Sequence, residues 1–153
     1  MQFKQITDQA FRCVLYLCGC QRPRSIEMIC KEATVPEQSV RKIMAKLRRS
    51  KIVNLIRGEN SGYTLAKSPE KISPFDVAIL FENTVNINRC LEEDKFCDRN
   101  GSQNDCPVRA YLDEMQTKIN NHLKDISFLE IYEQSNEYKR KKNKPIRLGR
   151  EME

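Results

Sequence analysis

Residues 25–51 decide the fold of this chain, and they read SIEMICKEATVPEQSVRKIMAKLRRSK. Apolar side chains recur at helical spacing in two stretches, and a four-residue break, residues 34–37, separates them. Ser25 is a favourable N-cap for the first stretch. Two short amphipathic helices joined by a tight turn are typical of a helix-turn-helix motif.

A β-hairpin is predicted directly after this motif. The two β-like stretches are residues 52–57 and 63–66, and five turn-forming residues, 58–62, lie between them. A hairpin in this position is the wing of a winged helix.

Further helices are predicted on both sides of the winged helix. Apolar spacing predicts a first helix that ends near Cys18, with Thr7 or Asp8 as its N-cap. Another helix is expected to begin at Ser73-Pro74, because proline suits the first helical position. A long helix is expected from Pro107, with one apolar stripe: Val108, Leu112, Met115, Ile119, Leu123 and Ile126.

These elements predict a mainly α fold with a small β wing, in which a winged helix-turn-helix domain is followed by a long dimerisation helix. The expected divisions are a DNA-binding domain at 1–83, a cysteine-rich loop at 84–106, a dimerisation helix region at 107–136 and a basic, disordered tail at 137–153. The chain has no apolar run near the roughly 20 residues of a membrane span. We therefore expect a soluble, cytoplasmic protein with no membrane partner.

Charge is distributed unevenly along the 153 residues. Residues 1–69 carry 13 basic and 5 acidic side chains, whereas residues 70–137 carry 7 basic and 14 acidic ones. A basic N-terminal part followed by an acidic middle part indicates that the N-terminal part binds a polyanion.

Candidate DNA contacts lie on the second helix of the motif and on the wing. The segment 41–51 has six basic residues and no acidic ones. One face of a recognition helix packs against the core of the protein. The opposite face presents amide and cationic side chains to the bases and phosphates of DNA. The expected DNA-binding residues are Gln38, Ser39, Arg41, Lys42, Lys46 and Arg49 on the helix, and Arg57, Ser61 and Gly62 on the wing.

Three of the seven cysteines, Cys90, Cys97 and Cys106, lie within seventeen residues. They are candidate metal ligands, since cysteines of a reducing compartment seldom form structural disulfides. If Pro107 is the first helical residue, Cys106 is an N-cap, where the helix dipole stabilises a thiolate. The only histidine, His122, is distant in sequence, so no local fourth ligand is evident. The other four cysteines fall on apolar helix faces and are expected to be buried.

The combined pattern resembles the dimeric winged-helix regulators that include the iron–sulfur cluster regulator (IscR) and the nitric-oxide-sensitive repressor (NsrR). The resemblance covers about residues 1–133. It rests on TDQAFR at 7–12, AKLRR at 45–49, the wing residues RG at 57–58 and GYTLA at 62–66, the three cysteines and the long helix. It implies a homodimer that binds a near-palindromic double-stranded operator.

The resemblance also implies a cofactor. Cys90, Cys97 and Cys106 would hold a 4Fe–4S or 2Fe–2S cluster whose loss changes DNA affinity. Asp8, within the TDQAFR context, would be the fourth ligand, supplied by the partner subunit; its alternative role is a helix cap. The cysteine gaps are longer than is usual in this family.

The expected function is a transcriptional regulator, and more specifically a repressor, rather than an enzyme. The sequence shows no nucleophile–base pair or phosphate loop, and one histidine leaves little acid–base chemistry. The alternative is a cluster-free or zinc-stabilised winged-helix regulator that responds to a small ligand or to a partner protein such as a cysteine-metabolism enzyme.

Overall fold

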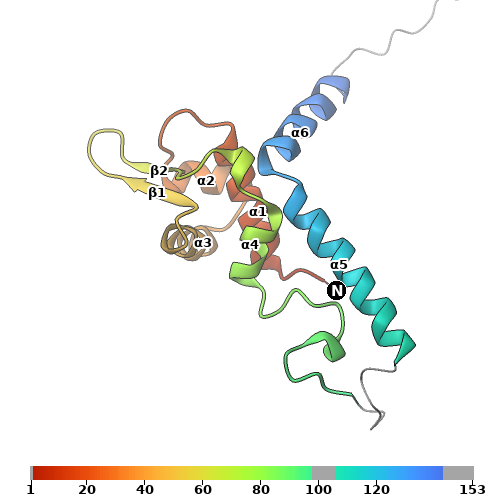
Figure 1. Ribbon diagram of the computed structural model, residues 1–153. Coiled ribbons are helices and arrows are strands. Elements are labelled where there is room, and N and C mark those ends of the chain that lie inside the picture. Colours follow the sequence, from red (N-terminus) through yellow and green to blue (C-terminus); the bar gives the residue numbers. More distant parts are fainter. Residues whose placement is uncertain (1, 98–105, 143–153) are drawn as a thin grey trace, which may run out of the picture.

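The computed structural model describes residues 2–97 and 106–142, which form a helical head with a hairpin at one side and a long arm of two helices (Figure 1). The head is residues 2–81 and the arm is residues 106–142. Within these residues no helix combines the length and apolar character needed to cross a membrane. The elements are α1 (Gln5–Cys18), α2 (Ile26–Ala33), α3 (Glu37–Arg49), β1 (Val53–Ile56), β2 (Gly62–Leu65), η1 (Pro69–Lys71), α4 (Pro74–Phe81), η2 (Arg89–Leu91), α5 (Pro107–Asp125) and α6 (Phe128–Lys142).

The predicted helix-turn-helix is α2 and α3. The Ser25 hydroxyl accepts a hydrogen bond from the backbone N–H of Met28 at 3.2 Å, so Ser25 caps α2 as expected. At the other end of α2, Thr34 has a φ of 53°, and this left-handed residue turns the chain toward α3. The predicted tight turn is therefore present, closed by the left-handed Thr34, but Glu37, expected in the break, is the first residue of α3.

The hairpin after α3 is also present, as an antiparallel pair in which Val53 lies opposite Leu65 and Ile56 opposite Gly62. Gly62 is not at an exposed tip: it is buried, its φ is +150°, and a Cβ there would lie 2.6 Å from the backbone of Arg24. Tyr63 and Arg24 then exchange backbone hydrogen bonds of 2.8 and 3.0 Å. Gly62 thus lets the chain before α2 pack against the wing, and its contact with DNA stays a prediction.

The core lies inside the head, between α1, α2, α3 and α4. It consists of apolar side chains that occupy the inner faces of these helices and the start of β1. Its largest fully buried members include Val14, Leu17, Ile29, Val40, Ile43, Met44, Leu47, Val53, Ile72 and Val77. The capping box of Ser73 and Asp76, with Pro74 at the first helical position, begins α4 where the sequence predicted it.

The first helix begins earlier than predicted. Its N-cap is Lys4, which makes no side-chain cap, so neither Thr7 nor Asp8 caps α1. Thr7 is instead fully buried, and its hydroxyl donates a short hydrogen bond to the carboxylate of Glu82. Because this partner lies 75 residues away in sequence, local propensity could not reveal it.

The predicted long helix is divided in two. α5 ends at Asp125, and Ser127 begins α6 through reciprocal hydrogen bonds with Glu130. Phe128 is buried, and its N–H donates to the carbonyl of Ile72 at 2.9 Å, which seats α6 on the head. The expectation of a disordered tail from residue 137 is wrong for 137–142, which continue α6; residues 143–153 lie outside the described part.

Candidate nucleic-acid interface and cysteine segment

Helix α3 separates its apolar and polar side chains. Val40, Ile43, Met44 and Leu47 are buried in the head. Of the candidate DNA contacts on this helix, the exposed ones are Gln38, Arg41, Lys42 and Arg49, while Ser39 and Lys46 are partly exposed. The polar face of a two-faced helix is therefore accessible to a groove of DNA.

The cationic side chains of α3 differ in whether another side chain already contacts their charge. Arg41 forms an exposed ion pair with Glu37 at 2.6 Å, one helical turn away. The ammonium of Lys46 lies 5.3 Å from the centroid of the Phe81 ring, a cation–π contact that fixes its position. Within the described residues Lys42 and Arg49 have no ion-pair partner, so their charge is available to phosphates.

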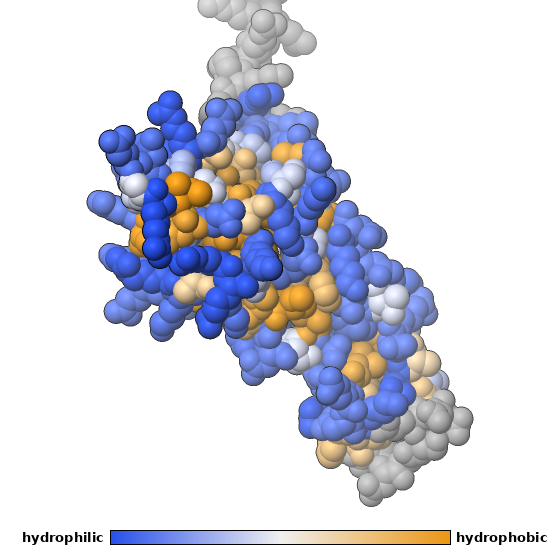
Figure 2. All heavy atoms as spheres, turned by 60° about the vertical axis from the view of Figure 1, so that its left-hand side comes forward, coloured by the Kyte–Doolittle hydropathy of each residue, from blue (hydrophilic) through white to orange (hydrophobic). Residues whose placement is uncertain are grey.

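The wing contributes exposed side chains beside α3. Arg57 and Ser61 are exposed, and Gly58 next to Arg57 has a φ of +110°, which turns the hairpin. Hydrophilic side chains dominate this side of the molecule, with apolar residues between them (Figure 2). One of the exposed apolar side chains of the head is Ile56 of β1, at 40%.

The cysteine segment, residues 82–97, is tied to the arm by Gln116 of α5. This side chain is buried; its oxygen accepts from the N–H of Ile87 at 2.6 Å, and its nitrogen donates to the carbonyl of Val85 at 3.0 Å. The role of Gln116 is not visible in the sequence, because a glutamine on a polar helix gives no signal of its distant partners. The Gln116 side chain thus holds the segment along α5 and satisfies backbone groups that an extended loop would otherwise leave without a protein partner.

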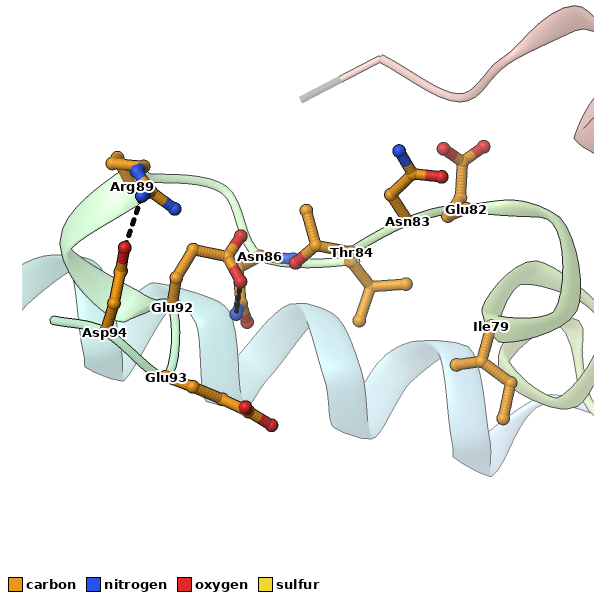
Figure 3. Close-up of a pocket in the computed structure, with 10 residues that line it drawn as sticks. Ile79, Glu82, Asn83, Thr84, Asn86, Arg89, Glu92, Glu93 and Asp94 are labelled. Carbon is orange, nitrogen blue, oxygen red and sulfur yellow. Dashed lines mark hydrogen bonds and ion pairs between the residues drawn. The ribbon is translucent and has the colours of Figure 1, made fainter. Parts of the chain in front are cut away.

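The other end of the cysteine segment is tied to the head. Glu82 accepts from Thr7 and from the backbone N–H of Lys4, the latter at 2.8 Å. Beyond it lies an acidic groove of about 600 Å³, whose lining includes Glu92 (Figure 3). Arg89 pairs with Asp94 at one end of this groove (Figure 3). The segment therefore connects the first turn of α1 with α5.

The three candidate ligands are partly buried cysteines. Cys90 lies in η2, Cys97 ends the described part of the segment, and Cys106 is the N-cap of α5, as expected from Pro107. The guanidinium of Arg109 donates to the carbonyl of Cys90 at 3.2 Å, which brings η2 to the first turn of α5. Among residues 2–97 and 106–142, however, no three Cys, His, Asp or Glu side chains form a metal-binding group.

Asp8 lies on α1 with its carboxylate 64% exposed and 3.0 Å from the guanidinium of Arg12. The same guanidinium donates to the carbonyl of Thr34 at 2.8 Å and to that of Ala33 at 3.2 Å. Arg12 therefore connects Asp8 to the turn between α2 and α3. This connection bears on function because the turn sets the position of α3.

The remaining cysteines are less uniformly buried than expected. Cys13 is fully buried, but Cys18, Cys20 and Cys30 are only partly buried. Desolvation by burial raises the pKa of Cys13 to about 12 and that of Cys18 to about 11. Because the thiolate is the nucleophile, these two side chains are unreactive at neutral pH in the folded protein.

Known proteins share both the sequence and the fold. A protein of Aquifex aeolicus assigned to the HTH-type transcriptional regulators is 26% identical over 132 residues, covering 86% of this chain and 91% of that protein. The HTH-type transcriptional regulator NsrR of Shouchella clausii is 25% identical over 96 residues, covering 61% of this chain and 64% of that protein.

Two solved structures have a similar fold. CymR, the global cysteine regulator of B. subtilis, superposes with a TM-score of 0.70 at 15% identity, over 87% of this chain and 97% of that one. IscR of T. potens superposes with a TM-score of 0.70 at 18% identity, over 90% of both chains. The Rrf2 family model, described as "Iron-dependent Transcriptional regulator", matches residues 3–134. The resemblance stated from the sequence is therefore confirmed, and the chain belongs to the Rrf2 family of winged-helix transcriptional regulators.

Proposed function

We propose that this regulator is a repressor whose affinity for DNA is controlled by an iron–sulfur cluster on Cys90, Cys97 and Cys106. The observation that carries the proposal is the placement of the cysteine segment. It is held to α5 by Gln116 and to the first turn of α1 by Glu82, so a change in it reaches both the arm and the head.

In this proposal α3 enters the major groove of a near-palindromic operator. The exposed polar face of α3 supplies Gln38, Arg41 and Lys42, while Arg57 and Ser61 of the wing contact the flanking phosphates. Two such heads are needed to read two half-sites about one helical turn apart, which a homodimer provides.

The arm supports the homodimer. On α5 the side chains of Val108 and Tyr111 are 58% and 62% exposed, and Met115 and Ile119 continue the same face at spacings of three and four residues. An apolar face this open on a helix of 19 residues is suited to pairing with a second copy.

The donor chemistry of Cys90, Cys97 and Cys106 fits a cluster. Thiolates are the ligands of iron–sulfur clusters, and the N-cap position of Cys106 favours a thiolate. The three cysteines are not gathered in the described residues, so the proposal requires Cys90, Cys97 and Cys106 to come together around the group when it binds. When bound, the cluster would supply iron that reacts with oxygen or nitric oxide.

Asp8 is the proposed fourth ligand, donated by the partner subunit. Its carboxylate is exposed and its only described partner is Arg12. If Asp8 leaves Arg12, the hold of Arg12 on Thr34 changes, and with it the turn that positions α3. This chain of contacts gives the cluster a route to the recognition helix.

The decisive experiment is the visible spectrum of the anaerobically purified protein, with iron and sulfide analysis. We expect visible absorbance with iron and sulfide, and we expect Cys97→Ala to lose all three. Cys30→Ala is the matched control, because Cys30 is a partly buried thiol outside the cysteine segment. A colourless, iron-free parent protein would overturn the cluster proposal.

The role of Asp8 is tested separately. We expect Asp8→Ala to take up a cluster but to lose it faster in air or nitric oxide, because a carboxylate is a hard ligand on a softer iron site. Glu37→Ala is the matched control, because Glu37 also forms an exposed ion pair with an arginine one helical turn away. Equal cluster lifetimes in both variants and the parent would remove Asp8 from the ligand set.

A cluster-free regulator is the second candidate function, favoured by the wide cysteine gaps and by the separation of the three thiols in the described residues. Such a regulator would respond to a small ligand or to a partner protein such as a cysteine-metabolism enzyme. It would bind its operator with unchanged affinity after Cys97→Ala, whereas the leading proposal expects a changed affinity.

A further inference from the structure

We infer that the groove between α1, α2 and α6 is a binding site for a small anion that carries carboxylate or phosphate groups. The groove has a volume of about 540 Å³, within the range of small-molecule sites. It lies in the head–arm junction, where α6 runs beside α1, far from the cysteine segment (Figure 1).

Charge complementarity identifies the class of ligand. Three cations line the groove, Arg12 from α1, Arg24 before α2 and Lys139 from α6, against one carboxylate, that of Glu32. The lining residues sum to +2, and Asp8, which pairs with Arg12 from outside the lining, lowers this to +1. The excess positive charge favours an anionic ligand. Guanidinium groups present forked donors that match carboxylate and phosphate oxygens.

Unsatisfied donors point to the same place. In the described part of the chain, the buried side-chain nitrogens and oxygens without a hydrogen-bond partner are the Nε atoms of Arg12 and Arg24, and both arginines line this groove. Buried donors are nearly always paired, so such atoms call for an acceptor. Both Nε atoms are covered, so a ligand would reach them by a shift of the side chains, and the new hydrogen bonds would favour that shift.

Tyrosines supply further donors on the two walls. Tyr16 comes from α1 and Tyr132 from α6. Burial, with the neighbouring Cys20 thiol, raises the pKa of Tyr16, so its hydroxyl remains protonated and can donate.

Gly19 allows the two walls of the groove to lie close together. A Cβ at this position would lie 2.5 Å from the Tyr132 hydroxyl, so α6 approaches α1 closely only because residue 19 has no side chain. A ligand held by Arg24 and Lys139 would therefore join the head to the arm. Arg12, which also holds the turn before α3, would sense its presence.

The site is tested with the full-length protein and two probes, succinate for a dicarboxylate and inorganic phosphate for a phosphate group. Each is titrated by calorimetry and by thermal unfolding at constant ionic strength. We expect saturable binding of at least one probe, with a rise in Tm of about 3–6 °C at ten times its Kd. The probe that binds more tightly identifies the anionic group.

Matched variants separate the site from general effects of anions on stability. Arg24→Ala and Lys139→Ala should each weaken binding at least tenfold. Arg22→Ala and Arg140→Ala are the controls: each removes an exposed charge outside the groove, two residues from Arg24 and one residue from Lys139, respectively. Both should bind the probe as the parent does. Arg24→Lys, which keeps the charge but not the fork, should be intermediate.

The outcomes are decisive in either direction. Absence of saturable binding for both probes would overturn the inference, as would equal binding by the parent, Arg24→Ala and Lys139→Ala. A parallel loss in Arg22→Ala and Arg140→Ala would also overturn it, because binding would then reflect overall surface charge. If Arg24→Ala does not fold, the pair Lys139→Ala and Arg140→Ala carries the test.

Discussion

The head and the arm of this regulator are both mainly helical but bury very different numbers of apolar residues. Of the eighteen apolar residues buried in the described structure, seventeen lie in the head and one, Phe128, lies in the arm. The arm instead exposes Val108 and Tyr111, and the only residue of α5 that is buried is a glutamine, Gln116.

This contrast shows that the two regions are stabilised differently. The head has its own core, and removal of apolar surface from water stabilises it by about 25 cal/mol per Å². The arm depends on contacts outside itself: Phe128 on the head, the cysteine segment on Gln116, and a second copy on α5 in our proposal. The head should therefore fold as a unit, whereas the arm should respond to its partners.

The largest expected effect is in the head. Leu17→Ala empties a site that is 2% exposed and should lower the free energy of unfolding by about 2–5 kcal/mol. Leu129→Ala makes the same truncation on α6, where the side chain is partly exposed, and should cost clearly less. Urea unfolding of both variants measures the difference. Equal losses would mean that the arm has a core of its own.

The next effect concerns the exposed face of α5. Ile119→Asp would place an unpaired charge in the proposed dimer seam, at a cost of about 3 kcal/mol or more. Sedimentation should show monomers with an intact head by circular dichroism, together with weak operator binding. The control is Asn121→Asp, which adds a charge at an exposed position of the same helix. A variant that remains dimeric would reject this seam.

A smaller effect is expected at the recognition helix. Lys42→Ala should weaken operator binding about tenfold, or about 1.4 kcal/mol, and should reduce the dependence of affinity on salt. Lys46→Ala should weaken binding similarly and should also lose its contact with Phe81. Lys71→Ala removes an exposed cation away from α3 and should bind normally. Binding that is insensitive to salt and to the first two changes would rule out this interface.

The smallest effect is expected at the junction of α5 and α6. Ser127→Ala removes the cap of α6 and should lower the free energy of unfolding by about 1 kcal/mol. Thermal unfolding measures this loss. Ser135→Ala, on the same helix but away from its start, serves as the control. If the two variants are equally stable, the burial of Phe128 against the head determines the start of α6 without the Ser127 cap.

The winged helix could be predicted because its signals are local. Apolar spacing places Val40 and Leu47 inward, Ser25 caps α2, and Ser73-Pro74 begins α4, all within a few residues of the structure they specify. The cap of α6 was equally local, in Ser127 and Glu130, but the apolar stripe that continues to Ile126 concealed it. Helical periodicity reports which face is apolar and says little about where one helix stops.

The sequence by itself determined the head, its two-faced recognition helix and the grouping of three cysteines before α5. Only the tertiary structure decided that Gly62 is buried against Arg24, that Thr7 donates to Glu82 instead of capping α1, and that Gln116 holds the cysteine segment. The physical reason is range. Caps and periodicity depend on neighbours within one or two helical turns, whereas these contacts depend on how distant elements pack, which no short stretch of the chain records.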